Sequence, residues 1–226
     1  ITGQEPGDFQ RLERALADLA YLKQSGIDLE TNGLRPYIPD PMILTAAVGS
    51  FERTVCFAID HPDGWGTKAR QQKVWDLFGE YLLFSGKKIA HNLSFEQEWL
   101  AFFYGPDLLR RTEWGDTMAM CHTLDEREGT KSLEVQTRIR FGFNLKNQSR
   151  ADVRRPKWWL EYPIKEILRY NGLDTKWTDL LARELEPEIR SHDATQWAEY
   201  QRKVRLCPTL VMTEAKGLEA DIGFAQ

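Results

Sequence analysis

The chain has 226 residues, of which 42% are hydrophobic, 12% aromatic and 28% charged, and its net charge is −4. This length and composition are typical of one ordinary globular domain; they exclude a disordered tail and leave little room for two full domains. The negative net charge argues against a protein that coats nucleic acid by bulk electrostatics, although a local channel for a nucleic-acid end stays compatible with it.

The cysteines and the apolar runs indicate the compartment. Cys56, Cys121 and Cys207 are odd in number and far apart, so we expect neither a disulfide framework nor a zinc cluster, and a reducing cytoplasm suits them. No apolar run approaches the roughly 20 residues of a membrane span, and residues 1–11 lack the order of a signal peptide. We therefore expect no membrane association. The chain starts at Ile1 without a methionine, which suggests a piece of a longer polypeptide.

The first half of the chain alternates helix and strand signals. Apolar residues at steps of three and four predict an amphipathic helix within residues 1–20. Three short β-rich runs separated by turn signals then predict an antiparallel meander, and the strand-helix-strand order after them is typical of an α/β sheet. The expected segments are strands at 21–30, 42–50 and 54–60, a helix at 68–84, a strand at 87–92, a helix from about 94 and a strand near 112–117.

The second half is mostly helical in its patterning. Residues 132–140 and 164–185 predict helices, and Pro187 marks the expected end of the second one. Residues 190–226 predict a further helix and a connector that contains glycines. The expected fold is α/β, with a mixed central sheet of three antiparallel strands followed by parallel strands, flanking helices and a helical C-terminal part.

Two acids near the end of the first strand share a face. The strand period of two places Asp28 beside Glu30 and turns Ile27 and Leu29 to the opposite, core side. Neighbouring like charges are unfavourable unless a cation or a raised pKa relieves them. Such a pair is also typical of a solvated strand rim, so the pattern alone leaves both interpretations open.

A third acid follows the buried strand. Ser94 and Gln97 have the spacing of a capping box, which places Glu96 in the first turn of a helix. An acid there complements the positive end of the helix dipole, and a metal role is the alternative. His91 and Asn92 precede it at the strand end, where α/β folds usually bind ligands, although a single histidine is often structural.

The fourth acid interrupts an apolar helix face. Asp174 shares that face with Ile167, Tyr170, Trp177 and Leu181, at steps of three and four. A carboxylate in an apolar stripe loses solvation free energy unless it is paired or binds a metal. A buried salt bridge and a metal site both meet that need. Tyr170 lies one turn away, where it either places a phenol beside the carboxylate or belongs to the core.

The four acids together offer only oxygen ligands, a set that selects hard divalent ions such as Mg²⁺ or Mn²⁺. Two such ions about 4 Å apart can activate a water and stabilise the leaving oxygen of a phosphodiester. The sequence therefore predicts a two-metal site for phosphodiester cleavage. Its predicted ligands are Asp28, Glu30, Glu96 and Asp174.

Three segments resemble the exonuclease motifs of the DEDDy group in the DnaQ-like, ribonuclease H-like superfamily. They are DLETNGL (28–34), AHNLSFE (90–96) and YNGLD (170–174), and their order and spacing match as well. The resemblance implies a 3′→5′ exonuclease with a ribonuclease H-like fold. Residues 115–126 further resemble the proofreading domain of bacterial DNA polymerase I. Residues 206–224 resemble the connector to the thumb of family A DNA polymerases.

The resemblance also implies roles for the metal-binding residues. Asp28, Glu30 and Asp174 would bind the catalytic metal, and Asp28 would bridge to the second ion. Glu96 would reach that ion directly or through water, and Tyr170 would orient the attacking water. The family usually has Asp at the Glu96 position. The longer arm shifts the carboxylate by roughly 1 Å, and misplacement on that scale can reduce the rate about 100-fold.

The substrate contacts follow from the same resemblance. Leu34 would wedge against the terminal base, and Asn92 would contact the terminal nucleotide. Asp116 would be structural or would support the metal ligands from behind. His91, at the same strand end as Asn92, is a further candidate for substrate contact. Residues 150–159 combine basic and aromatic side chains and either contact phosphates and bases or form a solvated loop. The residues concerned are Arg154, Arg155, Lys157, Trp158 and Trp159.

These features predict an exonuclease that removes nucleotides from single-stranded DNA 3′ ends with two Mg²⁺ or Mn²⁺ ions and proofreads for a family A DNA polymerase. Residues 1–187 would be the exonuclease domain, and 188–226 a helical connector toward a polymerase domain in the same full-length polypeptide. Two alternatives stay open. One is an RNA 3′-end trimming nuclease similar to ribonuclease D, because the tyrosine-type motif serves both substrates. The other is a structural exonuclease-like domain in which catalysis is weakened because Glu96 stands where the family usually has Asp.

Overall fold

A five-stranded sheet forms the centre of the computed structural model, which describes residues 1–84, 86–145, 160, 162–192 and 194–217. The strands are β1 (Gln24–Thr31), β2 (Ile43–Gly49), β3 (Thr54–Ala58), β4 (Lys87–Ala90) and β5 (Trp114–Asp116). Their order across the sheet is β3-β2-β1-β4-β5. β1, β2 and β3 pair antiparallel, while β4 and β5 continue the sheet parallel to β1. The predicted mixed α/β sheet is therefore confirmed.

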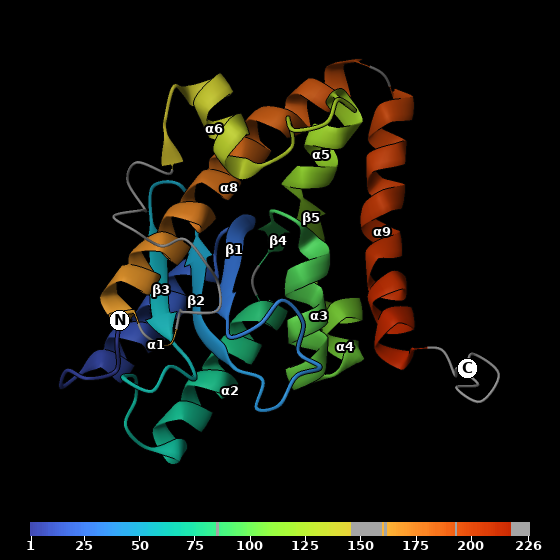
Figure 1. The fold of residues 1–226 in the computed structure, drawn as a ribbon. Coiled ribbons are helices and arrows are strands. Elements are labelled where there is room, and N and C mark those ends of the chain that lie inside the picture. Colours follow the sequence, from blue (N-terminus) through green and yellow to red (C-terminus); the bar gives the residue numbers. More distant parts are fainter. Residues whose placement is uncertain (85, 146–159, 161, 193, 218–226) are drawn as a thin grey trace.

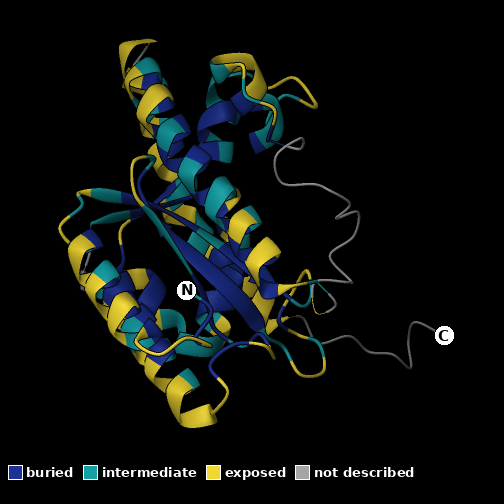
Figure 2. Cartoon of the chain, turned by 90° about the vertical axis from the view of Figure 1, so that its left-hand side faces the viewer, coloured by how far each residue is buried: buried dark blue, intermediate teal, exposed yellow. Residues whose placement is uncertain are grey.

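Helices flank the sheet on both faces. They are α1 (Asp8–Leu19), α2 (Lys68–Phe84), α3 (Leu93–Tyr104), α4 (Pro106–Arg111), α5 (Thr117–Leu124), α6 (Leu133–Phe141), α8 (Ile164–His192) and α9 (Ala194–Lys216). α8 crosses β1, β2 and β3, and α9 runs along α3 and α5 at the far edge (Figure 1). Figure 2 shows the strands buried between helices whose outer faces are exposed.

Side-chain alternation along β1 separates the core from the site. Ile27 and Leu29 belong to the core cluster that also contains residues of α1 and α2. Gly26 and Asp28 point the other way, toward α8, where Asp28 accepts a hydrogen bond from Asn171. The period of two predicted for this strand is thus observed, and it leaves one face free to carry polar groups against α8.

Two helix boundaries differ from the prediction. α8 runs through Pro187 to His192 rather than ending before the proline, because Leu185 and Ile189 on either side of it are buried in a core cluster shared with α9. α3 begins at Leu93, with Asn92 as its N-cap at a φ of 80°, so no capping box forms at the predicted position.

Two glycines set the distance between α8 and the sheet. A Cβ atom on Gly26 would lie 2.5 Å from the Thr175 carbonyl oxygen, and one on Gly172 would lie 2.3 Å from a side-chain sulfur of β3. Any larger residue at either position would push α8 outward. Since Asp28 lies two residues after the first glycine and Asp174 two residues after the second, the glycines control how closely the two carboxylates approach.

The remaining expectations concern cysteines, membranes and domains. All three cysteines are free thiols, as predicted. Within the described residues, every helix is too short or too polar to cross a bilayer. The division at 187/188 falls inside α8 and stays a prediction.

Candidate active site

One pocket brings together the predicted metal ligands, Tyr170 and the three residues predicted to contact the strand end. It has a volume of about 240 Å³ and lies where β1 and the parallel β4 end, beside the start of α3 and the middle of α8. The carboxyl ends of parallel strands are where α/β sheets usually bind ligands. The predicted residues that line the pocket are Asp28, Glu30, Leu34, His91, Asn92, Glu96, Tyr170 and Asp174.

Three carboxylates converge in this pocket. Asp28, Glu30 and Asp174 each offer an oxygen, and these oxygens lie within 4.8 Å of one another. Glu30 is buried, and the two aspartates are half-buried. Glu96 is also buried and lines the same pocket, but it lies outside this closest group. The convergence of the early strand with the late helix is thus as the sequence predicted.

Burial makes the negative charges of these acids unfavourable. It raises the pKa values of Asp28 and Glu30 well above their ordinary range, and the neighbouring carboxylates raise them further. Burial likewise raises the pKa of Glu96, whose Oε2 atom has no hydrogen-bond partner among the described residues. Such groups stay ionised near neutral pH only if a cation compensates them. An oxygen-only set that lacks positive charge fits a divalent metal ion.

Tyr170 places a hydroxyl beside the acids. The residue is half-buried and lines the pocket. Burial raises the pKa of its phenol, and the charges of Asp174, Glu30 and Asp28 raise it further. The hydroxyl therefore stays protonated and can donate a hydrogen bond.

Asn171 is a site residue that the sequence reasoning did not single out. It is fully buried, and its side-chain amide donates to the backbone oxygen of Asp28 at 3.2 Å and to Oδ2 of the same residue at 3.1 Å. These bonds fix the carboxylate in place on β1. A signal was available, because Asn171 lies one helical turn before Asp174, on the same face of α8.

Asp116 fastens the opposite wall of the pocket. Its carboxylate accepts hydrogen bonds from the backbone N–H groups of Asn92 at 3.1 Å, Leu93 at 3.3 Å and Met118 at 2.8 Å. It thereby caps α5 and holds the start of α3, which carries Glu96. These contacts agree with the structural role predicted for Asp116.

His91 and Leu34 lie at the edge of the acid cluster. His91 Nδ1 is 2.9 Å from the Thr117 hydroxyl oxygen, and burial lowers the pKa of the ring to about 4. The imidazole is therefore neutral at pH 7 and supplies no charge to balance the acids. Leu34 is 75% exposed, which leaves its side chain open to contact a bound molecule. The predicted contacts of residues 150–159 lie outside the described part of the chain.

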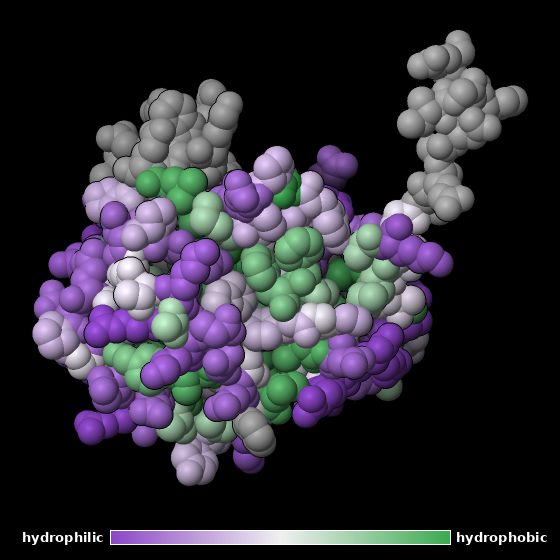
Figure 3. All heavy atoms as spheres, turned by 90° about the horizontal axis from the view of Figure 1, so that it is seen from below, coloured by the Kyte–Doolittle hydropathy of each residue, from purple (hydrophilic) through white to green (hydrophobic). Residues whose placement is uncertain are grey.

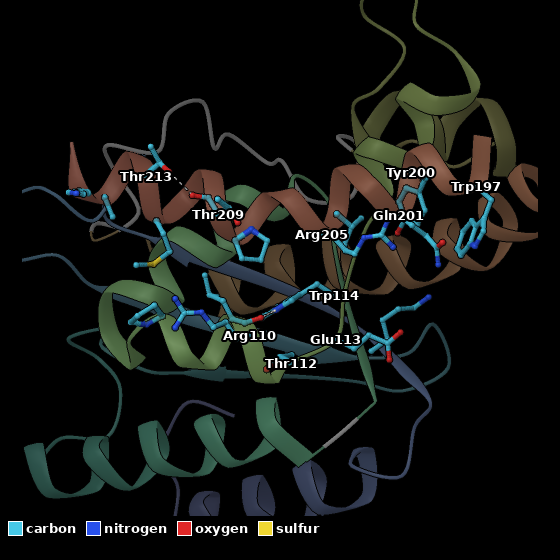
Figure 4. Close-up of a pocket in the computed structure, with 18 of the residues that line it drawn as sticks. Arg110, Thr112, Glu113, Trp114, Trp197, Tyr200, Gln201, Arg205, Thr209 and Thr213 are labelled. Carbon is cyan, nitrogen blue, oxygen red and sulfur yellow. Dashed lines mark hydrogen bonds between the residues drawn. The ribbon is translucent and has the colours of Figure 1, made fainter. Parts of the chain in front are cut away.

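A larger hollow lies between α4, β5 and α9, with a volume of about 1810 Å³ (Figure 4). It opens where β4 and β5 begin, at the opposite end of the strands from the acids. Lys87 and Arg190 in its wall both pair with Glu186, at 2.8 Å each. The only acids that line it are Glu113 and Glu186 among the described residues, so it lacks the carboxylate convergence of the smaller pocket.

The fold is similar to that of several solved nuclease structures. Escherichia coli RNase D, an exoribonuclease involved in structured RNA processing, matches with a TM-score of 0.66 and 17% identity, over 90% of this chain and 49% of that one. Brucella melitensis NrnC bound to pGG matches at 0.65 and 18%, over 91% of both chains. Trypanosoma brucei RNase D in complex with RNA U12 matches at 0.61 and 15%, over 96% and 75%. The chain therefore has the predicted ribonuclease H-like fold, which it shares with these structures.

The similarity is structural and partial in length. No protein-family model and no curated protein matches the sequence. The chain spans about half the length of Escherichia coli RNase D and of the Trypanosoma brucei RRP6 catalytic core, at 49% and 50%. Another structure of Brucella melitensis NrnC has bound Mg²⁺. Together with the carboxylate cluster, this supports the predicted divalent metal cofactor.

Proposed function

We propose that the chain is a metal-dependent 3′→5′ exonuclease that acts on RNA ends. The convergence of three carboxylates within 4.8 Å, in a pocket shared with Glu96 and Tyr170, carries this proposal. RNA is favoured as the substrate because Escherichia coli RNase D is an exoribonuclease and Trypanosoma brucei RNase D was solved with RNA. DNA proofreading is the second candidate. It is supported by the resemblance of residues 115–126 and 206–224 to family A polymerases.

The acids have the central role in this proposal. Asp28, Glu30 and Asp174 hold divalent cations, and Glu96 completes the set directly or through water. Two ions bound there would supply an activated water and neutralise the leaving oxygen of the phosphodiester. Tyr170, as a protonated donor, orients the attacking water.

The remaining pocket residues position the strand end. Leu34, which is exposed at the rim, contacts the terminal base. Asn92 and His91 contact the terminal nucleotide from the turn between β4 and α3. The cytoplasmic location and the division into residues 1–187 and 188–226 stay predictions.

The test uses RNA and DNA strands of the same sequence, labelled at the 5′ end and incubated with Mg²⁺. We expect stepwise shortening from the 3′ end that is faster on RNA and is lost in an Asp28→Ala/Glu30→Ala double variant. Glu13→Ala, which removes an exposed acid of α1 that does not line the pocket, is the matched control. Faster shortening of DNA would favour proofreading, and shortening of neither strand would overturn the proposal.

Glu96→Asp separates an active nuclease from a weakened one. The pocket is built around the longer arm of Glu96, which is buried at 2% exposure. We expect the shorter arm to lower the rate by up to about 100-fold, since a carboxylate misplaced by roughly 1 Å is costly. A large gain of activity would instead show that the natural site is impaired.

A further inference from the structure

The loop between β1 and β2 lies along one face of α3, beginning at the acidic pocket. Leu34 of the loop and Phe95 of α3 line the pocket together. One residue further along the loop, Arg35 donates a hydrogen bond to Glu98 of α3 at 3.0 Å. The loop and the helix therefore run side by side away from the pocket.

Two aromatic rings lie further along the same path. Tyr37 of the loop and Phe102 of α3 meet edge to face, with ring centroids 6.2 Å apart. Each residue is 48% exposed, so the pair presents an apolar surface to water. Figure 3, which views the molecule from below, shows apolar residues in patches between hydrophilic ones on that face.

Glu98 holds the aromatic pair in a fixed position. Its side chain is buried at 7% exposure and pairs with Arg35, which also reaches Glu214 of α9 at 2.8 Å. Burial, followed by the charge of Glu98, raises the pKa of Tyr37, which places that phenol near the same carboxylate. Because two carboxylates neutralise Arg35, this surface offers ring faces rather than free positive charge.

The distance from the pocket corresponds to a few nucleotides. Phe95 and Phe102 are two helical turns apart on one face of α3, a separation of about 10 Å. A stacked strand advances roughly 3.4 Å per nucleotide, so the aromatic pair lies about three nucleotides from the pocket. A dinucleotide whose end lies in the pocket stops short of it.

We propose that Tyr37 and Phe102 form a stacking platform for a base about three nucleotides upstream of the 3′ end of single-stranded RNA. The proposal rests on the exonuclease function proposed above. Aromatic faces stack on any base, so the platform binds RNA without reading its sequence. It adapts the chain to strands of several nucleotides, such as the RNA U12 held by Trypanosoma brucei RNase D, rather than to pGG, which is held by Brucella melitensis NrnC.

The test compares a hexanucleotide and a dinucleotide of RNA on a Tyr37→Ala/Phe102→Ala variant. We expect KM for the hexanucleotide to rise about tenfold with kcat unchanged, as loss of a base stack predicts, and the dinucleotide to be cleaved as by wild type. Because stacking is less sensitive to salt than phosphate contacts, the difference should persist at high salt. Tyr21→Ala is the matched control, since Tyr21 is 91% exposed and precedes the opposite end of β1.

Equal losses on both lengths would show damage to the pocket, and no loss on either would show that the rings do not touch RNA; both results overturn the platform. Fluorescence anisotropy measures the binding of the two RNAs to an Asp28→Ala background without cleavage. It therefore shows directly whether the two rings contribute to binding of the hexanucleotide. Wild type that binds the hexanucleotide through Tyr37 and Phe102 but shortens no strand would refute the exonuclease and leave the platform standing.

Discussion

Two aspartates of α8, the half-buried Asp174 and the buried Asp179, lie five residues apart and have opposite surroundings. Asp179 accepts a hydrogen bond from the Phe51 N–H at 2.9 Å and pairs with Arg183 at 2.7 Å. It thereby ties the β2–β3 turn to the helix. Asp174 lies instead beside Asp28 and Glu30 of β1, and carboxylate oxygens of the three residues are within 4.8 Å of one another. Residue type and helix are the same, and the main difference is the set of partners.

The difference separates a residue that holds the fold from one that needs a ligand. The donors around Asp179 offset part of the cost of burying its charge, although burial still raises its pKa, whereas the carboxylates around Asp174 add to that cost until a cation binds. Clusters of acids with strongly raised pKa values are typical of functional sites. The comparison therefore predicts that the two aspartates respond oppositely to the same substitution.

Asp174→Asn is expected to have the largest effect on activity. A metal ion contributes several kcal/mol to transition-state stabilisation, so its loss lowers the rate on the order of 1,000-fold. The melting temperature of the metal-free protein should not fall, because one of the repelling charges is removed. Single-turnover cleavage of labelled RNA and thermal unfolding in EDTA measure the two effects.

Asp179→Asn is the matched control on the same helix. It weakens hydrogen bonds to a charged group worth about 2 kcal/mol, and we expect a melting temperature lower by about 4–8 °C. Cleavage well below that temperature should match wild type. If Asp179→Asn abolished cleavage while Asp174→Asn only lowered stability, the comparison would be reversed.

Asn171→Ala tests whether positioning of Asp28 matters for metal binding. The buried amide donates to the Asp28 carboxylate at 3.1 Å. Loss of such a supporting hydrogen bond usually weakens metal affinity by about 10–100-fold. Cleavage should therefore need more Mg²⁺ and recover when Mg²⁺ is raised. Gln10→Ala, at an exposed position of α1, should leave the Mg²⁺ dependence unchanged. A rate loss that no Mg²⁺ concentration restores would contradict a positioning role.

Local patterns were sufficient to predict much of the fold and the pocket. Strand alternation at Asp28 and Glu30 and helical spacing at Tyr170 and Asp174 depend on the nearest few residues, so they could be read before any tertiary contact was known. The structure brings the four residues together in one pocket at the carboxyl end of the central strand β1. Whether they bind metal stays a prediction.

Features that depend on distant contacts could not be predicted in the same way. α8 continues through Pro187 because burial of the flanking residues outweighs the local preference to stop. Asn171 acquires its role only because Gly26 and Gly172 let the helix approach the strand that carries Asp28. The choice between RNA and DNA was likewise open, since the motifs describe the acids and not the sugar.

The last predicted effect concerns the pH dependence of stability. In the unfolded chain, carboxyl groups have their ordinary pKa values of about 4. In the folded protein, burial raises the pKa values of Asp28, Glu30 and Glu96. Between these values the folded state binds more protons than the unfolded state. The free energy of unfolding of the metal-free protein therefore falls as the pH rises above about 4.

Mg²⁺ should offset this loss, because bound cations replace the protons that the folded acids otherwise need. At about 100 times its dissociation constant a ligand adds about 2.7 kcal/mol, which raises the melting temperature by about 5–10 °C. We expect that rise near pH 8, a smaller one near pH 5, and little at either pH in Asp174→Asn. Thermal unfolding with Mg²⁺ or EDTA measures it. An equal rise at both pH values would mean that Mg²⁺ binds away from the buried acids, and Asp174 would then resemble Asp179 after all.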